Sequence, residues 1–100
     1  MDKKIQEIEI NTEVGKLINE GVLFDGVTIS LKPTNQAEIL TLATLSLFGK
    51  YPASPIIKTN NGEDYVITED KIGELLSQMH LKIEDARQVG RKMKKELINN

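Results

Sequence analysis

Residues 69–98 read EDKIGELLSQMHLKIEDARQVGRKMKKELI, and they predict the longest helix of the chain. Thr68 is a good N-cap for a helix, and Glu69 and Asp70 suit the positive end of its dipole. Nothing in the sequence interrupts the helix before the final two asparagines. About 30 residues at 1.5 Å each make a rod of roughly 45 Å, whereas a globule of this chain length has a radius of gyration of about 13 Å. We therefore expect part of the helix to project from the domain or to lie along a partner.

An apolar stripe runs the length of this helix at alternating spacings of four and three residues, which is a heptad pattern. Its members are Ile72, Leu76, Met79, Ile83, Ala86, Gly90, Met93 and Leu97. The stripe is typical of a coiled-coil seam for self-association or for docking on another protein. It is equally typical of a core helix that packs on its own sheet and on the N-terminal helix. Both can hold, with the first half packed internally and the second half reaching outward.

The later half of the stripe is the candidate protein-interaction seam. Gly90 in a helix interior costs about 1 kcal/mol relative to alanine, and a close contact with another backbone would offset that cost. The occupant is either another chain or the N-terminal helix. The seam residues are Ile83, Ala86, Gly90, Met93 and Leu97.

Two β-hairpins are predicted upstream. Asp25-Gly26 is a strong signal for a type I′ turn, and it places Phe24 opposite Val27 and Val22 opposite Ile29.

In the second hairpin, Asn61-Gly62 is interpreted as the same kind of two-residue turn. That turn pairs Ile57 with Val66 and Ile56 with Ile67. This hairpin would be apolar on both faces near its base, which suits a central position in the sheet.

Two further helices complete the pattern. Asn35 with Glu38 fits a capping box that opens a helix, which is apolar nearly all round and therefore expected to be buried; Gly49 ends it. Residues 2–20 predict an N-terminal helix, firmer from Asn11, which could serve as its cap, and ended by Gly21.

These elements predict an α+β domain in the order α-β-β-α-β-β-α, with a small antiparallel sheet packed by helices. The 100 residues form one domain: an N-terminal helical arm at 1–20, two hairpins and a buried helix at 21–68, and the long amphipathic helix at 69–98. The formal net charge is −2, and cysteine is absent. We expect a soluble protein made in the cytoplasm, without disulfides, thiolate metal sites or membrane spans.

The sequence offers little chemistry. His80 is the single histidine, so neither a histidine metal site nor a catalytic pair is expected, and residues 60–64 lack the spacing of a calcium loop. No catalytic, cofactor-binding or small-molecule site is predicted, and an enzyme is not expected.

A basic patch lies near the C-terminus. One interpretation is a solvent-exposed helix face whose cations favour the helix C-terminus. The other is a helix that contacts the phosphates of a nucleic acid. The second is disfavoured because aromatic residues are absent nearby and the domain is slightly acidic. The patch comprises Arg87, Arg91, Lys94 and Lys95.

Five pieces occur in a fixed order over about residues 17–98: residues 21–27 before a strand, 35–37 opening an Ala/Leu-rich helix, 57–59 before the Asn-Gly turn, 66–68, and a long helix carrying His80 in mid-course. This order resembles a phage and prophage domain family of unknown function, often found toward the C-terminal end of tail-fibre and other tail-associated proteins. Ile57 stands where that family usually has a tryptophan.

The resemblance implies a non-enzymatic tail or tail-fibre module that acts through helix-mediated protein contacts, and it carries no catalytic residues over. We expect a homo-oligomer or a complex with another phage tail protein, and a final place in the virion tail. The alternatives are a tail-fibre assembly chaperone, or a small nucleic-acid-binding regulator that uses the basic end of the helix.

Overall fold

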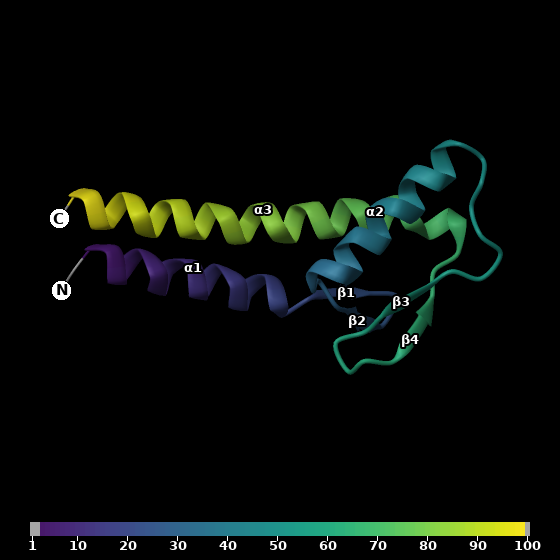
Figure 1. The fold of residues 1–100 in the computed structure, drawn as a ribbon, viewed down its shortest axis with the longest axis horizontal. Coiled ribbons are helices and arrows are strands. Elements are labelled where there is room, and N and C mark those ends of the chain that lie inside the picture. Colours follow the sequence, from purple (N-terminus) through teal and green to yellow (C-terminus); the bar gives the residue numbers. More distant parts are fainter. Residues whose placement is uncertain (1–2, 100) are drawn as a thin grey trace.

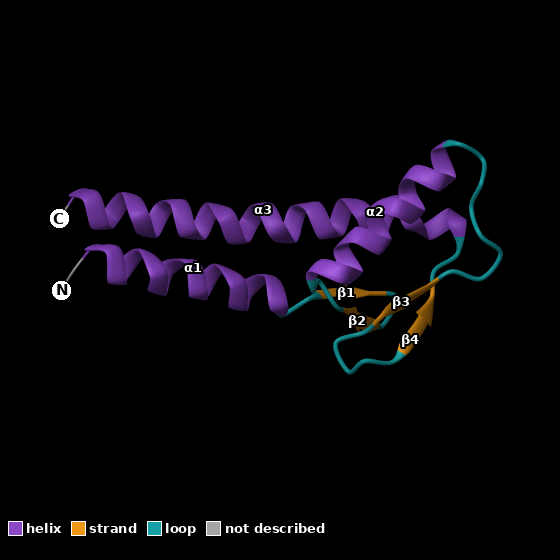
Figure 2. Ribbon diagram, viewed as in Figure 1, coloured by secondary structure: helices purple, strands orange, loops and turns teal. Residues whose placement is uncertain are grey.

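The computed structural model describes residues 3–99, and its elements follow the predicted order of helix, hairpin, helix, hairpin, helix (Figures 1 and 2). The α+β class is therefore confirmed. Of the predicted N-terminal arm, residues 1–2 lie outside the described residues. The elements are α1 (Lys3–Asn19), β1 (Val22–Phe24), β2 (Val27–Ile29), α2 (Pro33–Leu47), β3 (Ile56–Lys58), β4 (Asp64–Val66) and α3 (Glu69–Asn99).

The molecule is elongated because α3 extends far beyond the hairpins. Its radius of gyration is 16.3 Å and its principal extents are 53 × 27 × 20 Å, against about 13 Å expected for a compact chain of this length. α1 lies antiparallel along the C-terminal half of α3, and these two helices form an arm (Figure 1). The hairpins and α2 pack around the N-terminal half of α3 at the other end, which we call the body.

The first hairpin has the predicted register. Val22 pairs with Ile29 and Phe24 with Val27. Asp25 and Gly26 both have positive φ, 52° and 81°, as a type I′ turn requires at its two central positions.

The predicted register of the second hairpin is wrong by one residue. Ile56 pairs with Val66, and Ile57 pairs with Tyr65. Among the described non-glycine residues only Asp25 has positive φ, so the Asn61 position cannot complete a type I′ turn. The loop has three residues instead: the Gly62 N–H donates to the Thr59 carbonyl at 2.9 Å, and Gly62 has φ 80°. This is a turn followed by a glycine bulge.

The hairpins form two separate two-stranded sheets in the described chain, which corrects the expectation of one sheet with the second hairpin at its centre. They meet at a single bridge between Ile29 and Thr59. The Ser30 N–H donates to the Lys58 carbonyl at 3.0 Å. The Asn60 N–H donates to the Thr28 carbonyl at 2.9 Å. The base of the first hairpin is thus joined to the turn end of the second.

The buried Asn35 side chain strengthens this junction. Its Nδ2 donates to the Ser30 carbonyl at 2.6 Å and to the Lys58 carbonyl at 3.0 Å, while its Oδ1 accepts from the Lys58 N–H at 2.9 Å. The predicted capping role of Asn35 is therefore wrong. α2 begins earlier, at Pro33, with Lys32 as an N-cap that makes no side-chain cap bond. Proline suits this first helical position because its missing N–H would have no partner there.

α2 is buried on one side only, which corrects the expectation of a wholly buried helix. Ile39 and Leu42 face the core, at 0% and 1% exposure. Leu40, Leu47 and Phe48 remain exposed at 51%, 86% and 73%. Gly49, with φ 68°, follows the end of the helix as predicted.

α1 is continuous from Lys3, so Asn11 lies inside the helix and is not its cap. Gly21 follows the end of the helix with φ 75°, and a Cβ there would collide with the Ile29 carbonyl oxygen. Glycine is thus required both for the helix exit and for close contact with β2.

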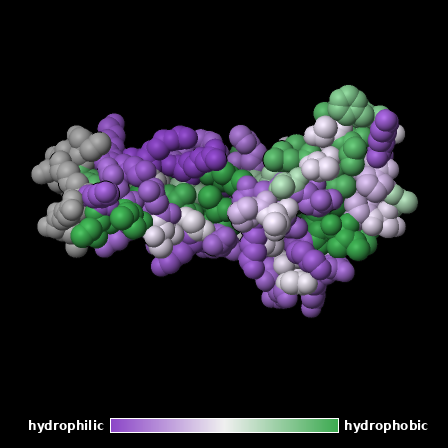
Figure 3. Space-filling model, viewed as in Figure 1, coloured by the Kyte–Doolittle hydropathy of each residue, from purple (hydrophilic) through white to green (hydrophobic). Residues whose placement is uncertain are grey.

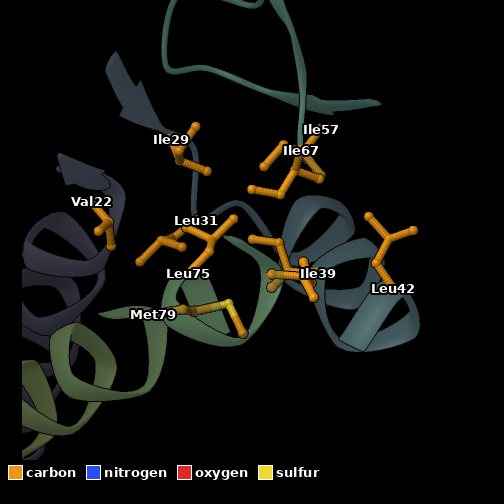
Figure 4. Close-up of a cluster of buried hydrophobic side chains, with 10 residues drawn as sticks. Val22, Ile29, Leu31, Ile39, Leu42, Ile57, Ile67, Leu75 and Met79 are labelled. Atoms are coloured by element: carbon orange, nitrogen blue, oxygen red, sulfur yellow. The ribbon is translucent and has the colours of Figure 1, made fainter. Parts of the chain in front are cut away.

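The core lies between the hairpins, α2 and the N-terminal half of α3. Figure 4 shows side chains from these elements pointing toward one another. Because the two sheets are small, α3 supplies a full side of this core. The cluster consists of Val22, Ile29, Leu31, Ile39, Leu42, Ile57, Ile67, Ile72, Leu75 and Met79.

Candidate interaction surfaces

The predicted seam of α3 lies against α1, one of the two occupants that the sequence leaves open. Ala86 and Gly90 are buried. A Cβ at Gly90 would lie 2.6 Å from Val14 Cγ2, so the glycine lets the two helices approach closely. Ile83 packs against the core cluster, whereas Met93 and Leu97 are half-buried farther along the arm.

A groove with basic walls runs along one flank of the seam. Arg87, Arg91 and Lys94 line it, and Val14 and Gly90 form part of its floor. The structure thus brings together three of the four residues of the predicted basic patch. The fourth, Lys95, is exposed and does not line the groove. We call this the basic groove.

A second groove lies on the other flank of the seam and has acidic walls. Glu9 and Glu13 of α1 and Glu96 of α3 line it. Its apolar lining is Ile10, Met93 and Leu97. We call this the acidic groove. Sequence reasoning missed it because its carboxylates come from opposite ends of the chain, and only the antiparallel docking of α1 brings them together.

The outer side of α2 is an uncharged surface. In Figure 3, hydrophobic surface gathers near the end of α2. Glu38 is the single charged residue between positions 33 and 48, and it lies off this side of the helix at about 100° per residue. We call this surface the α2 face, and its exposed members are Ala37, Leu40, Thr41, Thr44, Leu47 and Phe48.

A polar network ties the tip of the first hairpin to α3. The Tyr65 hydroxyl donates to Asp25 Oδ2 at 2.7 Å, and Lys71 Nζ donates to the same oxygen at 2.8 Å. Both hydrogen bonds hold the pKa of Asp25 below its ordinary value, and the bond from Lys71 is the stronger cause. The bond to Asp25 also raises the pKa of Lys71. The network links both hairpins to α3, and its three side chains are already engaged with one another.

His80 is exposed on α3, beside a shallow hollow lined by Leu76, Ser77 and Leu81. Within residues 3–99, no group of three or more histidine, cysteine or acidic side chains is placed to hold a metal ion. In the same part of the chain, no helix has the length and apolar character needed to cross a membrane.

Comparisons with models of protein families, with characterised proteins and with solved structures found no match to this chain.

Proposed function

We propose that this protein is a non-enzymatic structural or assembly module associated with a phage or prophage tail. It is made in the cytoplasm and acts there and in the virion through protein–protein contacts. The tail setting is supported by the ordered sequence resemblance over residues 17–98. The function in protein–protein contact is supported by the exposed α2 face.

The exposure of the α2 face is the main support for a function in protein–protein contact. Leu47 and Phe48 are 86% and 73% exposed, and the six exposed members of the α2 face carry no charge. Exposed apolar groups gathered on one surface mark interaction sites, and the centres of protein interfaces are depleted in charged residues. The partner that fits is a tail protein with an apolar, uncharged surface.

Introducing a charge at the α2 face should remove the protein from tail assemblies without unfolding it. Leu47→Lys alters a highly exposed side chain, so the free energy of unfolding should change by less than about 0.5 kcal/mol. The lysine would have to be desolvated on docking, which opposes binding. Mass spectrometry of purified particles should detect the native protein and lose the variant.

The matched control is Leu23→Lys, because Leu23 is 74% exposed on the first hairpin and is not part of the α2 face. That variant should enter particles at the native level. Entry of Leu47→Lys at the native level would contradict the proposed use of the α2 face.

Two alternative functions predict different experimental results from those of a tail component. An assembly chaperone would use the same α2 face but would be found on tail intermediates and be absent from finished particles. A nucleic-acid-binding regulator is favoured by the basic groove alone, where Arg87, Arg91 and Lys94 converge. Its binding would weaken steeply with salt, because phosphate contacts release counterions.

A further inference from the structure

We propose that copies of this chain associate side by side through their arms, with the acidic groove of one copy receiving the basic groove of the next. This contact does not use the α2 face, so it stands or falls independently of the proposed tail partner.

The opposite charge of the two grooves is the first argument. The acidic groove is lined by Glu9, Glu13 and Glu96 and by no cation. The basic groove is lined by two arginines and a lysine and by no acid. Although the net charge of the chain is only −2, acidic and basic side chains thus gather on opposite sides of the arm. Complementary charges on two surfaces steer association and fix its register.

Most of the charged side chains in the two grooves form no ion pair within the described chain. Of the groove residues, Glu13 has a 4.0 Å ion pair with Lys16, and Arg91 pairs with Glu84 at 3.1 Å. In the described chain, the charges of Glu9, Glu96, Arg87 and Lys94 take part in no ion pair. Most of the charge in each groove is therefore open to a partner.

The position of the grooves is the third argument. At about 100° per residue, Arg87, Arg91 and Lys94 fall on one flank of Gly90 and Glu96 falls on the other. Both grooves are built from α1 between residues 6 and 14 and from α3 between residues 87 and 97. They lie on opposite sides of the arm, and the acidic groove is offset by about one helical turn toward the free end of the arm. A second copy placed beside the first, with its arm pointing the same way and shifted by about one turn, brings the basic groove against the acidic one.

This geometry determines the kind of assembly. The contact joins two different surfaces, so each copy that binds still presents one free groove. Such heterologous contacts close into rings of three or more copies or continue as open filaments. A two-fold dimer cannot satisfy both grooves, since they lie on opposite sides of the arm.

Sedimentation equilibrium of the full chain at high micromolar concentration and low salt tests the proposal. The native protein should have a mass of at least three chains of 11.2 kDa. In about 1 M salt, where the Debye length is about 3 Å, the mass should fall toward that of one chain. A native protein that stays monomeric at low salt, or that stops at a dimer, would overturn the proposal.

Charge reversal makes the test specific. Glu9→Lys with Glu96→Lys, and separately Arg87→Glu with Lys94→Glu, should each reduce the mass to that of one chain. Mixing these two double variants should restore the large mass, because one now has two basic grooves and the other has two acidic grooves. Failure of the mixture to assemble, while circular dichroism shows both variants folded, would overturn the proposal.

A matched control separates groove charges from net charge. Lys92→Glu with Lys95→Glu changes the charge as much as the basic-groove variant does, but neither residue lines a groove. This control should assemble like the native chain, and its loss of assembly would count against the grooves. A monomeric native protein that binds oligonucleotides through Arg87 and Lys94 would assign the basic groove to nucleic acid and would also overturn the proposal.

Discussion

Replacing Gly90 with alanine should destabilise the protein, although alanine is the better helix former. The added Cβ would lie 2.6 Å from Val14 Cγ2. Valine in a helix has one strongly preferred rotamer, so this methyl group cannot easily move aside. Overpacking of this kind costs about 1–3 kcal/mol, which exceeds the gain of about 1 kcal/mol in helix propensity. Urea unfolding followed by circular dichroism should show the loss.

Two variants make this prediction sharp. Gly73→Ala lies in the same helix, where a Cβ would meet nothing within 4 Å, and it should raise the free energy of unfolding by about 0.5–1 kcal/mol. In a Val14→Ala background the collision at Gly90 is removed, so Gly90→Ala should become neutral or stabilising. If Gly90→Ala stabilises the native chain as much as Gly73→Ala does, the close contact of α1 and α3 is refuted.

Replacing Asn35 with aspartate should cost about 3–5 kcal/mol at neutral pH. The two side chains have nearly the same shape, but a carboxylate cannot donate to the Ser30 and Lys58 carbonyls that Nδ2 now serves at 2.6 and 3.0 Å. The variant buries an ionised group against two acceptors, which is strongly destabilising. The measurement is urea unfolding across a range of pH.

The pH dependence distinguishes this cause from loss of packing. Aspartate in this position should have a folded-state pKa above its unfolded value of about 3.9. The penalty should therefore be full at neutral pH and shrink as the pH falls through the folded pKa toward about 4. Asn61→Asp, an exposed loop position, is the control and should show little change. A penalty at Asn35 that does not vary with pH would contradict the hydrogen-bond account.

The two hairpins show how far local sequence determines register. Asp25-Gly26 offers two residues that tolerate positive φ, and the register it predicts is confirmed. The second turn is preceded by a further asparagine, so the chain can form either a two-residue or a three-residue loop. Apolar residues stand on both faces of that hairpin near its base, so a one-residue shift carries little penalty in the hydrophobic pattern. Contacts of β3 with Asn35 and with the first hairpin accompany the register that forms.

The errors at α2 have a tertiary cause. Asn35 satisfies the pattern of a helix cap, but three hydrogen bonds to residues 30 and 58 use its side chain instead. Those bonds require β3 to lie beside the start of α2, which no local pattern contains. In the described chain α2 packs on α3 and β3 through its other side, so its apolar outer residues stay exposed.

The arm shows a similar division between local and tertiary information. The heptad spacing predicts that one side of α3 must be covered, and the spacing of Arg87, Arg91 and Lys94 predicts that they share a flank. The occupant of the seam cannot be read from the stripe. The low amphipathicity of α1, which carries exposed Ile5 and Ile8 as well as buried Ile10, conceals which of its sides docks. The acidic groove follows only once that orientation is known.

In the structure, α1 of the same chain occupies the seam of α3. The sequence has no cysteine, so spin labels can be placed uniquely at the exposed positions Thr12→Cys and Gln88→Cys. The distance between the two labels should then be measured by double electron–electron resonance, alone and after mixing with a large excess of unlabelled protein. A narrow distribution of distances that persists on dilution is the predicted result. Loss of that distribution on dilution would show that α1 packs on another copy, and it would contradict the packing of α1 on α3 of the same chain.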